Sequence, residues 1–370
     1  MYISVIHSKH HHHIKPVTMK KHMPIILLAA AMLAASCDRN AVRTVNLENI
    51  PTTEPYTAGL ESIVQKIETV ELKCDSLYDI RIFADYDGRL FGSTADNKLV
   101  IFSEDGTLLH AYNKVGRGPG EYVWPVFSYD PYNHEILVYD GQNKVIRMDS
   151  DGRFIDEVRN SLTGVLGDII AVSKDRYAAT KMSNTERDSS IIYLDRDLNI
   201  TGKALPIYNK GQLSTKGLIA MEPVLLYNST PMFKPIGGFT YYTLDGAPYL
   251  HVELGRYAQP EDEATVVGVD ESNYLIQGLE DICGDWYLAE FYYEKGMCVF
   301  YEAVNTRTGE HAVHDIYTEQ NMENGEDEGF LFRHDGETMR VYPQYVKDNV
   351  LYWSRFSGDG STTLYKLTLK

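Results

Sequence analysis

The sequence predicts an all-β fold, a six-bladed β-propeller of four-stranded antiparallel blades that is closed by an N-terminal strand completing the last blade. Three observations predict it: an internal repeat, a strand-turn-strand pattern within each copy, and no long amphipathic helix pattern after residue 36. The chain has 44% hydrophobic and 24% charged residues, a balance that allows a large buried core and argues against extensive disorder.

The repeat is clearest over residues 89–112 and 135–158. These segments align without gaps at an offset of 46 residues, so that Asp105-Gly106 falls on Asp151-Gly152. Asp-Gly between alternating apolar runs is a strong hairpin signal, and each copy therefore predicts an antiparallel meander. One further step reaches Asp197, which Leu198 follows in place of the glycine.

The number of blades follows from the length of the repeat. Further hairpin patterns occur at 237–254, 285–304 and 349–370. Roughly 310 residues divided by a unit of about 46 to 52 gives six units, a length typical of four-stranded blades. The last hairpin shows three apparent strands, whereas residues 63–74 supply a spare one. We expect this N-terminal strand to complete the final blade and to protect its edge.

Residues 1–36 have the features of a signal peptide. Four lysines and no acidic residue precede an apolar run that is short for a membrane-spanning helix and ends in small residues. Met19 or Met23 is a more natural start than Met1. The histidines at 10–13 then belong to the leader, and we do not interpret them as a metal site.

The segment that follows the leader is expected to anchor the protein. Small residues before Cys37 resemble a bacterial lipobox, in which the cysteine is lipidated; Leu33 lies one position further away than that pattern prefers, so simple cleavage is the alternative. Residues 37–59 are polar and aperiodic, and we expect a tether spanning roughly 25 Å before the propeller of residues 60–370.

Charge and cysteine content exclude several classes of function. The formal net charge is −17, and it becomes −21 without the four leader lysines, which argues against nucleic-acid binding and against membrane contact other than through the anchor. Cys74, Cys283 and Cys298 show no zinc-site spacing. Cys283 and Cys298 should lie roughly 20–25 Å apart across a hairpin, too far for a disulfide. We expect a monomer without cofactors.

The segment VGRGPGEY, residues 115–122, lies between the first two repeats. Together with the signal peptide, the lipobox-like Cys37 and the spare N-terminal strand, it resembles the signature loop of six-bladed β-propeller lipoproteins of anaerobic gut Gram-negative bacteria. The resemblance covers nearly the whole mature chain. It implies an exported protein that is lipid-anchored in the cell envelope, at the outer membrane, and it implies no particular activity.

The signature loop itself is a candidate site. Its residues are Gly116, Arg117, Gly118, Pro119, Gly120 and Glu121. A phosphate-binding loop would end in Lys-Ser/Thr and open a helix, and neither feature is present. We expect a tight crossover between blades in which Arg117 pairs with Glu121, with Arg117 also a candidate for ligand contact at the rim.

Aromatic residues suggest a second kind of site. The chain has 27 tyrosines and three tryptophans, Trp124, Trp286 and Trp353, which are candidates for stacking against sugar rings. Most tyrosines should instead pack within half-buried strands. A platform made from two or three of them is the alternative.

No sequence motif indicates catalysis or a metal centre. GxSxG and HExxH do not occur, and His311 and His314 should face opposite sides of a strand. Aspartate-rich segments at 85–88, 149–152 and 195–197 lack the closing glutamate of a calcium loop and are expected to be turns. Acidic runs at 261–263 and 326–328 are expected to be solvated loops.

Two functional hypotheses follow. The first is a non-catalytic envelope lipoprotein that presents the propeller as a binding or scaffold module to a glycan or an envelope protein. The second is an extracytoplasmic glycan-active lyase or hydrolase with a site at the channel mouth. A pair of carboxylates about 5–10 Å apart in a central pocket, one of them with a raised pKa, would favour the enzyme.

Overall fold

The fold is that of a computed structural model of the whole chain. It describes residues 42–51, 55, 58–74, 77, 79–140, 144–159, 165–182, 190–202, 205–206, 225–228, 230–235, 238–260, 273–293, 298–357 and 360–370. Residues 43–370 form one compact unit, and the description below concerns that unit. The expected signal peptide and Cys37 lie outside the described residues.

Six blades, each with four antiparallel strands, form the ring, which confirms the predicted fold class; blade four carries one additional edge strand. Blades one to three contain β3 (Arg81–Tyr86), β4 (Arg89–Ser93), β5 (Leu99–Ser103) and β6 (Leu108–Tyr112); β7 (Pro125–Asp130), β8 (Glu135–Asp140), β9 (Lys144–Asp149) and β10 (Phe154–Arg159); and β11 (Val165–Ser173), β12 (Arg176–Met182), β13 (Ser190–Leu194) and β14 (Leu205–Pro206).

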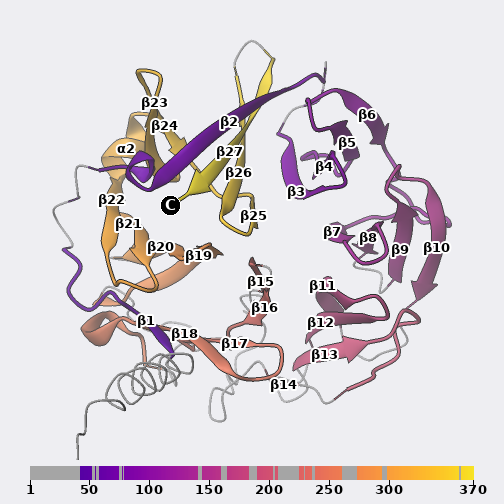
Figure 1. Cartoon of the computed structure of the whole chain (residues 1–370), viewed down its shortest axis with the longest axis horizontal. Coiled ribbons are helices and arrows are strands. Elements are labelled where there is room, and N and C mark those ends of the chain that lie inside the picture. Colours follow the sequence, from indigo (N-terminus) through magenta and orange to yellow (C-terminus); the bar gives the residue numbers. More distant parts are fainter. Residues whose placement is uncertain are drawn as a thin grey trace, which may run out of the picture. The chain divides into compact units, whose positions relative to one another are not determined.

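Blades four to six follow in chain order. They contain β15 (Leu225–Asn228), β16 (Thr230–Phe233), β17 (Thr240–Thr243) and β18 (Pro248–Glu253); β19 (Ile276–Cys283), β20 (Trp286–Tyr293), β21 (Cys298–Asn305) and β22 (His311–Thr318); and β25 (Tyr345–Lys347), β26 (Val350–Phe356), β27 (Thr362–Leu369) and β2 (Val64–Leu72). The first strand of each blade lies innermost, around the centre of the ring (Figure 1).

The repeat seen in the sequence corresponds to blades one and two. Residues 89–112 form β4 to β6, and residues 135–158 fall on β8 to β10. Gly106 and Gly152 take positive φ angles of 81° and 78° in equivalent turns, which a residue without a side chain adopts at no steric cost. In the third copy Leu198 takes the same conformation, with φ of 62°.

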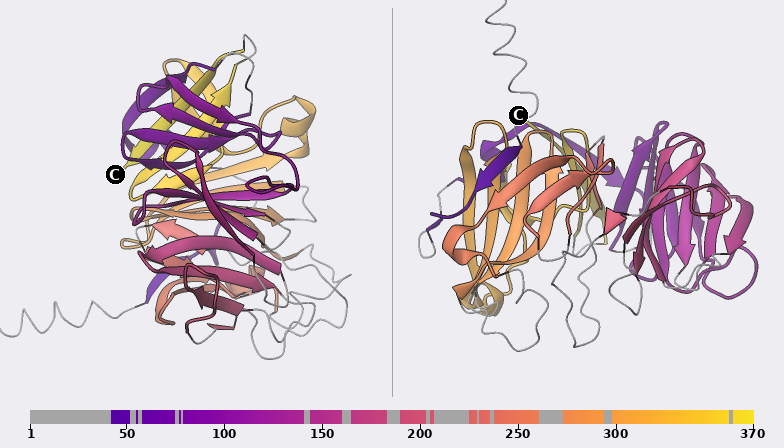
Figure 2. Two further views of the ribbon diagram at one scale, coloured as in Figure 1. Left: turned by 90° about the vertical axis from the view of Figure 1, so that its right-hand side faces the viewer. Right: turned by 90° about the horizontal axis from the view of Figure 1, so that it is seen from below.

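The ring is closed by strands from the two ends of the propeller, as predicted. β2 pairs antiparallel with β27 over its whole length, from Val64 opposite Leu369 to Leu72 opposite Thr362. Figures 1 and 2 show the indigo N-terminal strand beside the yellow C-terminal one. β2 then reaches the first blade, where the Lys73 amide donates to the Gly106 carbonyl at 2.9 Å.

The hydrophobic core lies between the blades. Among the described residues, six buried clusters each join two neighbouring blades. Strand β5 illustrates how one strand contributes to two of these clusters. Its residues Leu99 and Ile101 pack toward blade two, whereas Val100 and Phe102 pack toward blade six. Successive side chains of a strand point to opposite faces, so a blade covered on both faces needs a continuous apolar run.

The structure departs from the expected tether at residues 43–46. These residues form β1 (Arg43–Asn46), which pairs in parallel with β18 and makes blade four a five-stranded sheet. Val45 and Leu47 are fully buried between blades four and five. These two apolar residues, which alternate with polar ones, leave water by packing into that cluster. The Leu47 amide also donates to the Glu253 carbonyl at 2.7 Å.

An insertion between blades five and six was not predicted. After β22 come the short helix α2 (Glu319–Glu323) and a hairpin of β23 (Phe330–His334) and β24 (Glu337–Val341). Phe330, Phe332 and Val341 pack into the core between the two blades. The described residues contain no helix with the length and apolarity needed to cross a membrane.

The cysteines follow the expected geometry. Cys283 and Cys298 pair with Trp286 and Tyr293, at opposite ends of the same strand β20. Seven residues of strand separate those partners, roughly 23 Å, which is far beyond disulfide reach. Both thiols, and that of Cys74, are free of disulfides.

Closure by β2 should contribute measurably to stability. Leu72 is 2% exposed and packs between the first and last blades, so we expect Leu72→Ala to lower the free energy of unfolding by about 2–5 kcal/mol. Urea titration of the chain without its leader measures this change in the free energy of unfolding. Gln65→Ala, at an exposed position of β2, serves as the control. Equal effects of the two substitutions would contradict the role assigned to Leu72.

Candidate functional site

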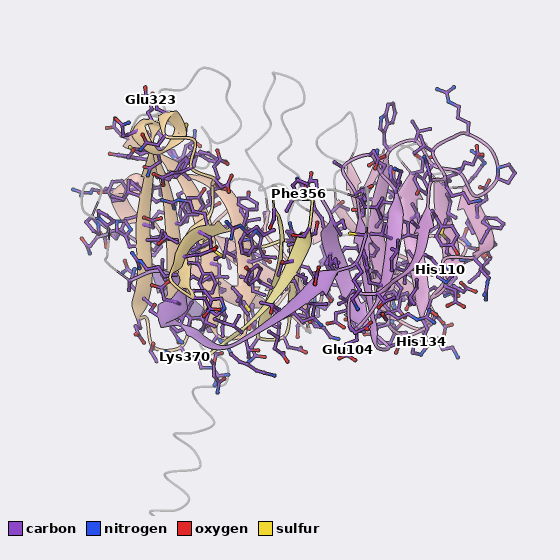
Figure 3. The ribbon with its side chains drawn as sticks, turned by 90° about the horizontal axis from the view of Figure 1, so that it is seen from above. Glu104, His110, His134, Glu323, Phe356 and Lys370 are labelled. Carbon is purple, nitrogen blue, oxygen red and sulfur yellow. The ribbon has the colours of Figure 1, made fainter. Side chains whose placement is uncertain are left out.

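The two ends of the propeller can be distinguished by labelled residues. In Figure 3, Glu104, His134 and Lys370 lie at one end, here called the lower end, and Phe356 and Glu323 lie at the other, the upper end. Trp124 belongs to the upper end, because β7 starts directly after it and ends before the turn that carries His134. Trp124 is 70% exposed.

The signature loop leads into Trp124 and is closed by backbone pairing. The Gly116 amide donates to the Tyr122 carbonyl, and the Tyr122 amide donates to the Lys114 carbonyl, both at 2.9 Å. Tyr122 is fully buried. The loop is therefore the tight crossover between blades one and two that the sequence predicts.

Glu121 fills the centre of this loop. Its carboxylate accepts a hydrogen bond from the Gly118 amide at 2.7 Å, and a Cβ on Gly116 would lie only 2.1 Å from it. The expected pairing of Arg117 with Glu121 is wrong, because the backbone amide takes the place of the guanidinium. A carboxylate in the position that a bound phosphate would occupy also excludes an anion-binding function for this loop.

Buried charges fix the far side of the loop. Lys144 is 1% exposed, donates to the Gly118 carbonyl at 3.3 Å and lies 3.4 Å from the Glu157 carboxylate. Glu157 in turn accepts from the Gly120 amide at 3.0 Å, and Gly120 has φ of 70°. Arg117 is exposed and forms no ion pair with the described residues, so it is free to contact a ligand.

The backbone at Trp124 is held by a buried carboxylate. The amides of Val123 and Trp124 both donate to Asp140 Oδ1 at 3.2 Å, and Asp140 is fully buried at the end of β8. Two hydrogen bonds to one carboxylate oxygen fix the chain direction at this point. The exposed indole therefore stands on a backbone that is ordered before any ligand arrives.

The other two tryptophans are part of the core. Trp286 is 4% exposed and its indole N–H donates to the Lys370 carbonyl at 3.0 Å. Trp353 is 7% exposed and packs on Tyr365, with ring centroids 4.9 Å apart. Both indole faces are covered by the protein, so neither forms the sugar platform that the sequence suggested. Of the three tryptophans, Trp124 alone is exposed.

A second cluster at the upper end was not identified from the sequence. Glu290 on β20 is 1% exposed, and Tyr292 and Tyr342 beside it are 37% and 36% exposed. The cluster lies at the upper end because β20 begins with Trp286, which contacts Lys370 at the lower end. With 27 tyrosines in the chain, no pattern singled out these two.

One carboxyl group on an innermost strand has a strongly raised pKa. Burial, with a smaller contribution from the neighbouring charge of Glu280, raises the pKa of Asp281 on β19 to about 7. Glu280 itself is buried in an ion pair with Lys234 and accepts a hydrogen bond from Tyr287. Asp281 is thus the group on this strand that would exchange a proton near neutral pH.

The expectation for His311 and His314 is wrong. A bulge lets Val304 pair with His311 while Ala303 pairs with Val313, which shifts the register by one residue. Both histidines then face Glu302: His314 Nδ1 is hydrogen-bonded to it, and His311 Nδ1 lies 4.0 Å away. Burial raises the pKa of Glu302 and lowers that of His311.

The aspartate-rich segments at 149–152 and 195–197 are turns, as expected. Asp149 Oδ1 accepts from the amides of Asp151 and Arg153, and Asp195 Oδ1 does the same for Asp197 and Asn199. These carboxylates cap their own loops. Among the described residues, no group of histidine, cysteine and acidic side chains has the arrangement of a metal site.

Asp281 should make stability depend on pH. Its pKa is raised in the folded state, so between about pH 4 and pH 7 the folded protein holds a proton that the unfolded chain has lost. Its contribution to stability therefore falls as pH rises through this window. We expect Asp281→Asn to flatten this part of the urea-midpoint profile.

The control is Asp175→Asn, which changes an exposed carboxylate in a turn. It should leave the slope of the profile unchanged. A slope between pH 4 and pH 7 that is the same in Asp281→Asn as in the unaltered chain would contradict the assignment of the raised pKa.

Comparisons with known proteins agree with this architecture. A family model described as "6-bladed beta-propeller" matches residues 41–229, about half of the chain. Among solved structures, a Bacteroides fragilis protein described as a "Putative exported protein" is 12% identical, with a TM-score of 0.61, and the alignment covers 89% of this chain and 100% of that one. A search of curated proteins finds no match.

Two other solved structures align with lower scores. BamB from Moraxella catarrhalis is 14% identical with a TM-score of 0.42, covering 82% of this chain and 100% of that one. Virginiamycin B lyase from Staphylococcus aureus is 14% identical with a TM-score of 0.37, covering 78% and 80%. At such low identity, likeness to solved structures concerns the fold alone, and the chemistry of the site must be argued from its residues.

Proposed function

Because the chain belongs to the six-bladed β-propeller family, we propose that it is a non-catalytic binding module of the cell envelope. The propeller presents its upper end to a glycan or to an envelope protein. The protein acts as a monomer and needs no cofactor. It contacts the membrane through a lipid on Cys37, at the outer membrane, and binds no nucleic acid.

The observation that carries this proposal is the exposed indole of Trp124. A large aromatic side chain that is 70% exposed loses hydration favourably when a ligand covers it, and its backbone is already fixed by Asp140. Fixing the platform in advance reduces the entropy lost on binding. Arg117 is exposed on the loop that precedes Trp124 in the sequence, and its guanidinium group is a further hydrogen-bond donor for a ligand.

Export and anchoring are supported by separate observations. The leader of residues 1–36 has the composition of a signal peptide, and the small residues before Cys37 fit lipidation. The description of the Bacteroides fragilis relative as exported agrees with this address. The acidic balance of the chain favours attachment by a lipid over adsorption to an anionic membrane surface.

A glycan array tests the carbohydrate form of the proposal. The chain without its leader, residues 38–370, should bind a subset of glycans, and Trp124→Ala should weaken that binding roughly tenfold, the value of one lost aromatic stacking contact. The matched control is Tyr132→Ala, which removes a 50% exposed aromatic ring from the turn before His134 at the lower end.

The outcomes separate the two partners. Glycan binding that is lost in Trp124→Ala but kept in Tyr132→Ala supports a sugar platform. An array without any signal would rule out the carbohydrate form and leave the envelope protein. Glycan binding that Trp124→Ala does not change would overturn the assignment of the site.

A second candidate function, a glycan-active enzyme, is favoured by one observation. Asp281 lies on an innermost strand and has a pKa of about 7, which suits a general acid. Release of reducing ends from array-positive glycans is the assay, with Asp281→Asn as the test variant. Turnover that disappears in Asp281→Asn would replace the binding proposal with the enzyme. Absence of turnover on every bound glycan would rule the enzyme out.

A further inference from the structure

Glu290 is a buried carboxylate without a counter-ion. It is 1% exposed, and no lysine, arginine or histidine of the described residues forms an ion pair with it. Three neutral groups donate to it, the Leu279 amide and the hydroxyls of Tyr301 and Tyr342, each at 3.2 Å. These donors occupy part of the hydrogen-bonding capacity of the carboxylate, but none of them carries a positive charge.

Two half-exposed aromatic rings lie beside this charge. Tyr292 and Tyr342 are each exposed by more than a third of their surface. Beside Glu290 and Tyr292 the backbone of β19 bulges, with a register shift between Gln277 and Glu280. A Cβ on Gly278 would lie 2.8 Å from both the Glu290 carboxylate and the Tyr292 ring, so glycine is required for the close approach.

Two carboxylates act on the hydroxyls of these tyrosines. Burial, followed by the charge of Glu290, raises the pKa of both Tyr292 and Tyr342. The charge of Glu328 acts on the same two hydroxyls in the same direction. The faces of aromatic rings are themselves electron-rich, so the rings and the carboxylates attract the same kind of group.

The insertion between blades five and six assembles this arrangement. Tyr342 directly follows β24, and Glu328 lies just before β23. Six complete blades do not need the hairpin for closure, since β2 already pairs with β27. Arg340 on β24 holds the hairpin to blade five through an ion pair with Asp315 on β22, and it also donates to the Gly329 carbonyl within the insertion at 2.8 Å. The insertion therefore places the Tyr342 ring against Glu290 and a second carboxylate, Glu328, near the hydroxyls of the two tyrosines.

We propose that Glu290, Tyr292, Tyr342 and Glu328 form a cation-binding site for a lysine or arginine side chain of a partner protein. The side chain places its ammonium or guanidinium group against the two rings and toward the carboxylates. The formal net charge of −17 attracts a basic partner surface over a longer range. The site lies at the same end of the propeller as Trp124 but on other blades, and it does not depend on the glycan hypothesis.

Other ligand classes fit these groups less well. An anion such as a uronate or a phosphate would be repelled by two carboxylates. A neutral sugar would stack on the tyrosines but would gain nothing from the uncompensated charge. A cation gains from both, as in the aromatic cages that recognise ammonium groups.

The test uses small probes of known charge with the chain of residues 38–370. N-acetyl-lysine methylamide carries the ammonium group, and N-acetyl-norleucine methylamide has the apolar stem without it. Titrations followed by NMR of carbon-13-labelled tyrosine rings should show saturable shifts with the lysine probe only. We expect the dissociation constant to rise roughly tenfold in Glu290→Gln and several-fold in Tyr292→Ala, and to rise with NaCl.

Further variants keep the result interpretable. Glu328→Gln changes an exposed carboxylate and should weaken the lysine probe even if Glu290→Gln impairs folding. Trp124→Ala should not affect this probe, which separates failure of this site from failure of the Trp124 platform. Equal binding of the norleucine probe would overturn the proposal, as would lysine binding that survives both Tyr292→Ala and Glu328→Gln. Tighter binding of glucosamine than of the lysine probe would overturn the assignment to a protein side chain.

Discussion

The pairing of β2 with β27 is the interaction on which the rest of this structure depends. Each blade buries apolar side chains on both faces, so every blade needs a neighbour on each side. An open ring would expose two such faces to water. Because β2 completes blade six and also contacts the turn at Gly106 in blade one, a single strand meets that requirement on both sides of the closure.

The sequence was most informative where local signals repeat. Asp105-Gly106 and Asp151-Gly152 mark equivalent turns, and the spare strand at 63–74 was assigned to the correct blade. The segment at 43–46 was missed because four residues carry too little periodicity to reveal a strand whose partner is β18. The inserted hairpin did carry a signal, Asp335-Gly336, but the blade count gave it no place.

Side-chain sites were harder to predict, because they depend on contacts across blades. Trp124 is exposed and Trp286 is buried, and the residues next to each tryptophan in the sequence do not indicate this difference. The bulge at Val304 turned two histidines toward one glutamate against the simple alternation of a strand. Two carboxylates, the buried Asp140 and the partly buried Glu121, accept hydrogen bonds from backbone amides. They shape the loop that leads to Trp124.

The docking of β1 changes how an anchored propeller would stand on a membrane. If residues 37–59 formed a tether without contacts to the propeller, a domain anchored through Cys37 could take many orientations relative to the membrane. Arg43 is held at the outer edge of blade four, so if Cys37 carries the proposed lipid, the five residues 38–42 would separate that lipid from the folded domain, a reach of about 20 Å at full extension. Attachment would then be through blade four and over a short distance.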